Sequence, residues 1–106
     1  MNYIDLTVFE NETLNFKTPE GKIINITKPS QRMVIEMLKF KNINGRTSAE
    51  NVIKALNNII FGIFNSNDEG YQFDIEYIEN GLNTQMKLAI VQAYSDFITK
   101  VQANPN

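Results

Sequence analysis

The sequence contains no cysteine and no histidine. Without cysteine the chain has no disulfide framework and no thiolate zinc site. Without histidine it lacks the commonest general base, the usual serine and cysteine triads and most transition-metal sites. The five glycines are scattered through expected turns and helix ends, so they form no phosphate-binding loop. We therefore expect a protein that is not an enzyme and that holds no metal and no cofactor.

Long apolar runs and excess positive charge are also missing. No run approaches the length of a membrane span, and the first ten residues, MNYIDLTVFE, carry acids where a signal peptide needs lysines. The net charge is −2 and the pI is near 5.0, whereas nucleic-acid binders are usually basic. We expect a cytoplasmic protein that binds neither a membrane nor nucleic acid.

Apolar residues are plentiful. They make up 42% of the 106 residues and include seven phenylalanines. A chain of this length and composition fits a single domain over residues 1–106 that buries one core.

The first 28 residues alternate as strands do. Ile4, Leu6 and Val8 fall on one face of an expected strand over 3–9. The pattern repeats over 13–17 and 22–27, and the segment from Pro19 to Gly21 between them is a hairpin turn signal. We predict an antiparallel meander of two or three strands, with Ile24 and the residues that share its face turned toward the core.

Residues 29–106 read as helices. Ser30, Thr47 and Asp74 stand where helix N-caps are expected, and Glu50 completes a capping box with Thr47. The spacing predicts four helices near 30–42, 47–65, 74–81 and 83–103. Their expected inward faces comprise Met33, Val34, Met37, Leu38, Val52, Ile53, Leu56, Ile59, Ile60, Ile63, Phe64, Ile75, Ile78 and Leu82. The predicted fold class is α+β, a small N-terminal hairpin or meander followed by a bundle of about four helices.

The last helix has a wide apolar stripe. Met86, Ile90, Ala93, Phe97 and Val101 recur at helical spacing, and Tyr94 with Ile98 widens the same face. We expect the five spaced residues to pack inside the domain and the two at the shoulder to line a partner surface, because tyrosine suits such an edge. The candidate partner-binding residues are Met86, Tyr94, Phe97 and Ile98. The alternative is that Tyr94 is an ordinary core residue.

Charge is unevenly distributed along the chain. Asp68, Glu69, Asp74, Glu76 and Glu79 form an acidic run whose spacing does not match a calcium loop. A solvated helix start explains this run, and a binding site for a basic partner is the alternative. The first half of the chain is net basic and the second half net acidic, which is compatible with plain solubility or with self-association.

The order of elements and the terminal motif resemble one protein family. The last helix reads Gln85-Met86-Lys87-Leu88, then Ala93-Tyr94 and Phe97-Ile98, and the chain closes with Asn104-Pro105-Asn106. This is similar to the tail assembly chaperones of long-tailed bacteriophages and prophages of Gram-positive bacteria, in layout over the whole chain and in residue identity over about 82–106.

The resemblance implies a function. A member of that family is not an enzyme; it binds the tape measure protein, assists polymerisation of the tail tube protein and is absent from the mature virion, and many members form homo-oligomers. Two other classes remain open, a small acidic inhibitor or immunity-type protein and a structural connector or completion protein of the virion.

Overall fold

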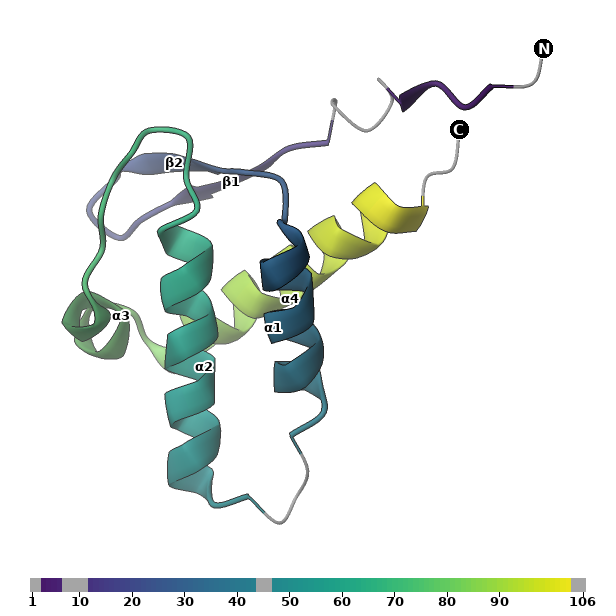
Figure 1. Cartoon of the computed structure of the whole chain (residues 1–106). Helices are drawn as coiled ribbons and strands as arrows, with labels where there is room; N and C mark the ends of the chain where they lie inside the picture. Colours follow the sequence, from purple (N-terminus) through teal and green to yellow (C-terminus); the bar gives the residue numbers. More distant parts are fainter. Residues whose placement is uncertain (1–2, 7–11, 44–46, 104–106) are drawn as a thin grey trace.

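The computed structural model describes residues 3–6, 12–43 and 47–103 (Figure 1). It contains an antiparallel hairpin followed by helices, which confirms the predicted α+β class. The elements in chain order are β1 (Leu14–Lys17), β2 (Ile23–Ile26), α1 (Gln31–Lys41), α2 (Ala49–Phe64), α3 (Ile75–Gly81) and α4 (Thr84–Ala103). Among the described residues, none of these helices is long and apolar enough to cross a membrane.

The hairpin follows its sequence pattern. β1 and β2 pair with Phe16 opposite Ile24, and the Thr18 N–H donates to the Lys22 carbonyl at 2.8 Å to close the turn. Gly21 has a φ of 91°, a conformation that favours glycine. Ile24 and Ile26 are buried, as the alternation predicts.

The expected strand over 3–9 is wrong for the part that the structure describes. Residues 3–6 form no strand, and Ile4 and Leu6 are 61% and 69% exposed; residues 7–9, with Val8, lie outside the described part. The loop after α2 pairs with β2 instead. The Thr27 N–H donates to the Ser66 carbonyl, and the Asp68 N–H donates to the Asn25 carbonyl, each at 2.8 Å.

Side-chain caps start each of the four helices, and at α4 the Asn83 Oδ1 accepts from the Met86 N–H at 2.8 Å. The Ser30 hydroxyl accepts from the Met33 N–H at 3.2 Å, and the Asp74 carboxylate accepts from the Tyr77 N–H at 2.8 Å, as predicted. The expected cap at Thr47 is wrong, because α2 begins one residue later. Ser48 is the N-cap and accepts from the N–H of the third helical residue, so Glu50 sits one place too early to close a capping box.

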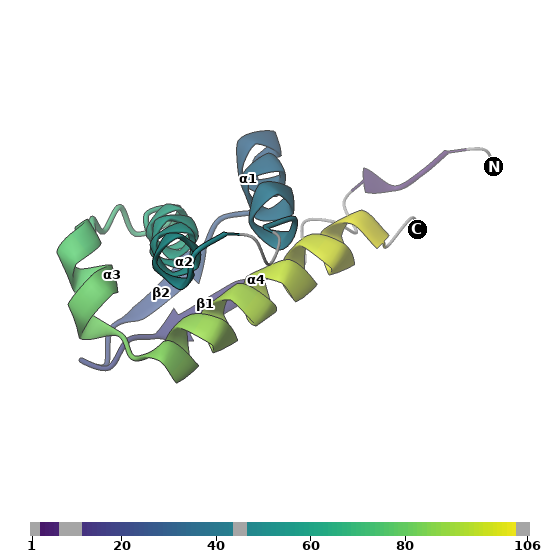
Figure 2. The same cartoon turned by 90° about the horizontal axis from the view of Figure 1, so that it is seen from below.

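The core lies where α2 and α4 pack beneath the hairpin. α2 contacts β2, α4 contacts β1, and the two helices contact each other (Figure 2). The buried apolar residues are Ile24, Ile26, Met37, Leu56, Ile59, Ile60, Ile63, Phe64, Ile78, Leu82, Ile90, Tyr94, Phe97 and Ile98.

In α1, α2 and α3, four residues expected inside are exposed. Leu38 is 54% exposed because α1 packs mainly against α2 and turns its other face outward. Val52 and Ile53 belong to the N-terminal part of α2, which extends past α3 and α4 (Figure 1). Ile75, in the first turn of α3, is 38% exposed, whereas Ile78 one turn later is fully buried.

Candidate protein-binding grooves

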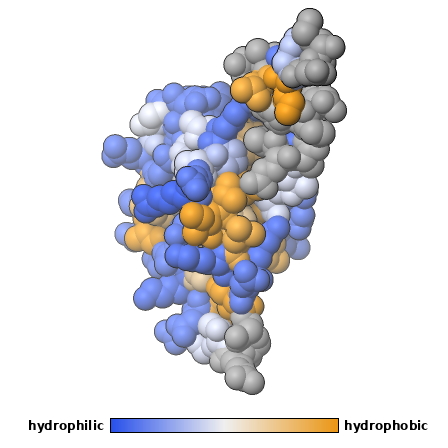
Figure 3. All heavy atoms as spheres, turned by 45° about the vertical axis from the view of Figure 1, so that its right-hand side comes forward, coloured by the Kyte–Doolittle hydropathy of each residue, from blue (hydrophilic) through white to orange (hydrophobic). Residues whose placement is uncertain are grey.

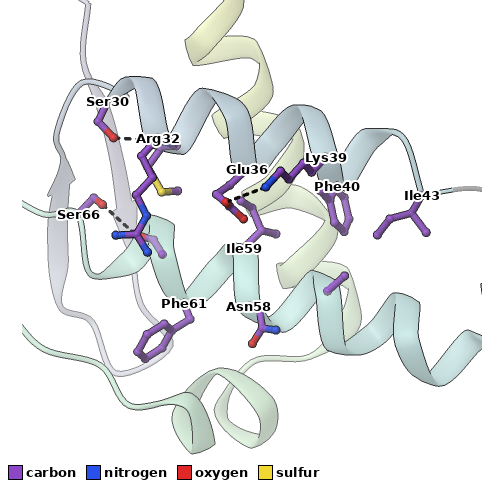
Figure 4. Close-up of a pocket in the computed structure, with 13 residues that line it drawn as sticks. Ser30, Arg32, Glu36, Lys39, Phe40, Ile43, Asn58, Ile59, Phe61 and Ser66 are labelled. Atoms are coloured by element: carbon purple, nitrogen blue, oxygen red, sulfur yellow. Dashed lines mark hydrogen bonds and ion pairs between the residues drawn. The ribbon is translucent and has the colours of Figure 1, made fainter.

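An open groove runs between α1 and α2, and we call it the α1–α2 groove (Figure 4). Its volume is about 720 Å³. The lining residues are Ser30, Arg32, Met33, Glu36, Lys39, Phe40, Ile43, Ala55, Asn58, Ile59, Phe61, Gly62 and Ser66. They recur at helical spacing on both helices, so the groove follows the length of α1.

In the lining of the α1–α2 groove, Gly62 of α2 lies against Met33 of α1. A Cβ on Gly62 would stand 3.2 Å from the Met33 Cε, which is tighter than ordinary van der Waals contact. Gly62 therefore lets α1 and α2 approach each other closely. Phe61, at the α2 side of the groove, is 38% exposed although it is a large aromatic residue.

The charged groups of the α1–α2 groove all come from α1. Figure 4 shows Arg32 extending from α1 toward α2, while Glu36 and Lys39 turn toward each other. The Lys39 Nζ lies 3.9 Å from the Glu36 Oε1, and both side chains are exposed, so this ion pair contributes little stability. The rim thus presents the guanidinium of Arg32 above an apolar floor.

A second groove lies between β1 and the start of α4, and we call it the α4–β1 groove. Its volume is about 240 Å³. It is lined by Phe16, Lys17, Thr18, Pro19, Phe64, Leu82, Met86, Ala89 and Ile90. Lys17 contributes the charge in this lining, and the floor is apolar. The rings of Phe16 and Phe64 pack there with centroids 5.8 Å apart.

The hairpin turn beside the α4–β1 groove is fastened to α3. The Tyr77 hydroxyl donates to the Glu20 Oε1 at 2.7 Å. Burial, and then the hydrogen bond to Glu20, raises the pKa of Tyr77 to about 12. The same hydrogen bond lowers the pKa of the Glu20 carboxyl from its ordinary value. This contact holds the turn, and with it one wall of the groove, in place.

The structure separates the four candidate partner-binding residues of the last helix. Met86 is 38% exposed and lines the α4–β1 groove. Tyr94 is fully buried, and Phe97 and Ile98 are buried beside it in the core. The prediction that Tyr94 and Ile98 line a partner surface at the shoulder of the stripe was therefore wrong. The alternative, that Tyr94 is a core residue, agrees with the structure.

The reason is that α4 packs against two neighbours at once. Contacts to α2 on one side and β1 on the other widen the buried stripe of α4. Tyr94 and Ile98 therefore lie in the middle of the buried stripe, and Met86 lies at its edge. Even Lys87 is buried, with its Nζ donating to the Glu79 carbonyl at 3.2 Å. The side chain of Val101 lies outside the described part of the chain.

Two members of the acidic run have structural roles. Asp74 caps α3, and the Glu69 carboxylate accepts hydrogen bonds from the backbone and side chain of Asn25. These bonds lower the pKa of Glu69, the backbone bond most. Over residues 3–6, 12–43 and 47–103, no three acids lie where they would hold a metal ion.

Compared with models of protein families, with curated proteins and with solved structures, this chain has no match. Its function is therefore argued from its surfaces. The α1–α2 groove was not predicted from the sequence. The sequence feature that could have indicated it is Gly62 inside an otherwise apolar helix, because this glycine lies opposite Met33 of α1.

The side of the molecule that carries α1 also presents apolar surface. Figure 3 shows apolar atoms gathered in the middle of this side, with hydrophilic residues around them. On α1, Ile35 is 45% exposed and Leu38 54% exposed. Exposed apolar surface rimmed by polar residues is typical of a protein-interaction site.

Proposed function

We propose that this chain is a non-enzymatic tail assembly chaperone of a long-tailed bacteriophage or prophage, which binds the tape measure protein and assists polymerisation of the tail tube protein. The observation that carries the proposal is the α1–α2 groove, together with the resemblance of the terminal segment 82–106 to that family. A long helical partner needs an apolar groove between helices into which its own apolar stripe fits.

The groove matches such a partner in chemistry. Met33 and Ile59 form an apolar floor, with Met33 packed against Gly62, and Met33 can adapt the shape of this floor because methionine is flexible. Phe61 supplies an exposed aromatic side chain of the kind that dominates interface energies. Arg32 at the rim favours a partner helix whose flanks are acidic.

The test is coexpression of the tape measure protein with this chain. The wild-type chain is expected to keep the tape measure protein in the soluble fraction and to be recovered with it. Phe61→Glu places a charge in the α1–α2 groove and is expected to weaken that binding by about tenfold or more. Ile53→Glu is the matched control, because Ile53 is on the same helix, 55% exposed and outside the groove lining.

The results of this experiment distinguish an error in the proposed function from an error in the proposed binding surface. If the wild-type chain neither binds nor solubilises the tape measure protein, the proposed function is wrong. If Phe61→Glu and Ile53→Glu bind equally well while both remain folded, the α1–α2 groove is not where the partner binds. Purified virions are expected to lack this chain, whereas a connector or completion protein would be found in them.

A further inference from the structure

A second hollow lies on the other side of Phe61, and we call it the aromatic pocket. Its volume is about 390 Å³, and it is lined by Phe61, Asn65, Gly70, Tyr71, Gln72 and Phe73. Phe61 also lines the α1–α2 groove, and Figure 4 shows its ring extending from α2 on the side away from α1. The groove and the pocket therefore share a wall, and a partner that covers Phe61 adjoins both.

Two asparagine side chains hold the aromatic pocket in shape. The Asn65 side chain donates to the Phe73 carbonyl at 3.0 Å and accepts from the Phe73 N–H at 2.8 Å. The Asn67 side chain makes the same pair of hydrogen bonds with the backbone of Tyr71, each at 2.9 Å. Because the backbone of both aromatic residues is fastened, less conformational entropy is lost when a ligand binds, and the pocket is preorganised.

The rings of the aromatic pocket already face a cation. The Lys22 Nζ lies 4.4 Å from the centroid of the Tyr71 ring and 5.8 Å from that of the Phe73 ring. Such distances are typical of a cation–π interaction, in which the negative face of a ring attracts the charge. Tyr71 is 37% exposed and Phe61 is 38% exposed, so part of each ring is open to a partner.

The charge around the aromatic pocket also favours a cation. Residues 55–86 contain five acids and no base. Three of these acids, Asp68, Glu69 and Asp74, flank the lining segment 70–73, and all three are exposed. The acids attract a basic partner over a distance, whereas the rings supply the surface that its side chain contacts.

We propose that the aromatic pocket binds an arginine side chain of the partner that occupies the α1–α2 groove. A guanidinium group is planar and stacks on aromatic rings, whereas a lysine ammonium is a compact and more strongly hydrated charge. Its several N–H donors also suit the side-chain oxygen of Gln72 in the lining. The proposal rests on the function proposed above, because the same partner lies in the groove. That partner carries acids on the flank that faces Arg32 and an arginine on the flank that lies over Phe61.

The first test uses the tape measure protein coexpressed with variants of this chain. Tyr71→Ala removes the ring and is expected to reduce the amount of tape measure protein recovered by about tenfold. Tyr71→Phe keeps the ring and is expected to recover as much as the wild-type chain does. The matched control is Tyr3→Ala, because Tyr3 is 71% exposed and outside the lining of the pocket. Thermal denaturation of each variant shows whether it remains folded.

A second variant reports the sign of the bound charge and does not depend on the folding of Tyr71→Ala. Lys22→Gln removes the cation that lies over the Tyr71 ring, so that a second cation in the pocket is no longer repelled. Recovery of the tape measure protein is expected to increase. A partner that places an acidic side chain in the pocket would instead bind Lys22→Gln less well than the wild-type chain, and this result would contradict the proposal.

The third test needs no tape measure protein. Two synthetic amphipathic helical peptides share a leucine stripe and glutamates on one flank. At one position of the other flank, the first has arginine and the second has citrulline, its uncharged analogue. The wild-type chain is expected to bind the arginine peptide with a Kd about tenfold lower. Tyr71→Ala is expected to bind both peptides equally, because the difference between them reports the coupling to the ring. Fluorescence anisotropy measures each Kd.

The results distinguish an error in this site from an error in the proposed function. If Phe61→Glu reduces recovery of the tape measure protein and folded Tyr71→Ala does not, the aromatic pocket takes no part in binding and the proposed function stands. If the tape measure protein does not bind but the arginine peptide binds in a way that depends on Tyr71, the proposed function is wrong and the site stands. Equal binding of the two peptides by the wild-type chain, or binding of neither, would overturn the site.

Discussion

Tyr94 is fully buried, and its hydroxyl oxygen has no hydrogen-bond partner among the described residues. A buried polar group without a partner is destabilising, so removing it is favourable. We predict that Tyr94→Phe raises the free energy of unfolding by about 1 kcal/mol, measured by urea denaturation. Tyr77→Phe is the control of opposite sign, because the Tyr77 hydroxyl donates to Glu20. A loss of stability in Tyr94→Phe would show that the hydroxyl does have a partner.

The same burial makes stability depend on alkaline pH. Burial raises the pKa of Tyr94 from 10.0 to about 12, so the folded state holds the phenolic proton more tightly than the unfolded state. This contribution is complete below pH 10 and is lost as the pH rises from 10 to 12, by about 3 kcal/mol in total. The wild-type protein should therefore lose more stability over this range than Tyr94→Phe. Parallel losses in the two proteins would contradict the prediction.

At the start of α2, the sequence predicts the position of the N-cap only to within one residue. Thr47 and Ser48 are adjacent and both carry a hydroxyl, but only Ser48 accepts from the Asn51 N–H. We predict that Ser48→Ala lowers the free energy of unfolding by about 1 kcal/mol, whereas Thr47→Ala has a much smaller effect. Thermal or urea denaturation of both variants measures this. An equal loss of stability in both would contradict the assignment of the cap to Ser48 alone.

At the scale of elements, α2 is the helix on which the fold depends, because it contacts α1, α3, α4 and β2. Ile60 is fully buried in the middle of it, whereas Ile53 is 55% exposed in its N-terminal part. We predict that Ile60→Ala lowers the free energy of unfolding by about 2–5 kcal/mol and that Ile53→Ala changes it by less than about 0.5 kcal/mol. Similar urea midpoints for the two variants would contradict this orientation of α2.

Helix positions were predictable from spacing, but helix rotations were not. The periodicity located four helices and the two strands that the structure contains. It did not place Tyr94 correctly, because the width of a buried stripe depends on how many neighbours cover it, and α4 has two. Met86 and Tyr94 look equivalent in the pattern of the last helix, yet one is 38% exposed and the other fully buried.

The two grooves were beyond prediction for a related reason. Each depends on distances between elements that are far apart in the chain, such as Gly62 against Met33 or Met86 against Lys17. Periodicity along one segment carries no information on such distances. Similarly, the segment 66–68 beside β2 has no strand pattern, and backbone hydrogen bonds alone place it there.

At the scale of the whole molecule, the chain is extended. Its Cα radius of gyration is 15.1 Å and its principal extents are 53, 36 and 20 Å, whereas a compact chain of this length has a radius of about 13 Å. Residues 3–6 contribute to the difference, because they lie away from the hairpin (Figure 1). Ile4 and Leu6 are 61% and 69% exposed, so this segment lengthens the molecule without adding to its core.

This shape leads to a prediction about thermal stability. A chain that lacks residues 2–6 is expected to melt within a few degrees of the wild-type chain, because Ile4 and Leu6 are mostly exposed and their loss removes little buried surface. Calorimetry of both proteins at the same concentration measures this. A shortened chain that melts much lower would show that residues 2–6 stabilise the fold.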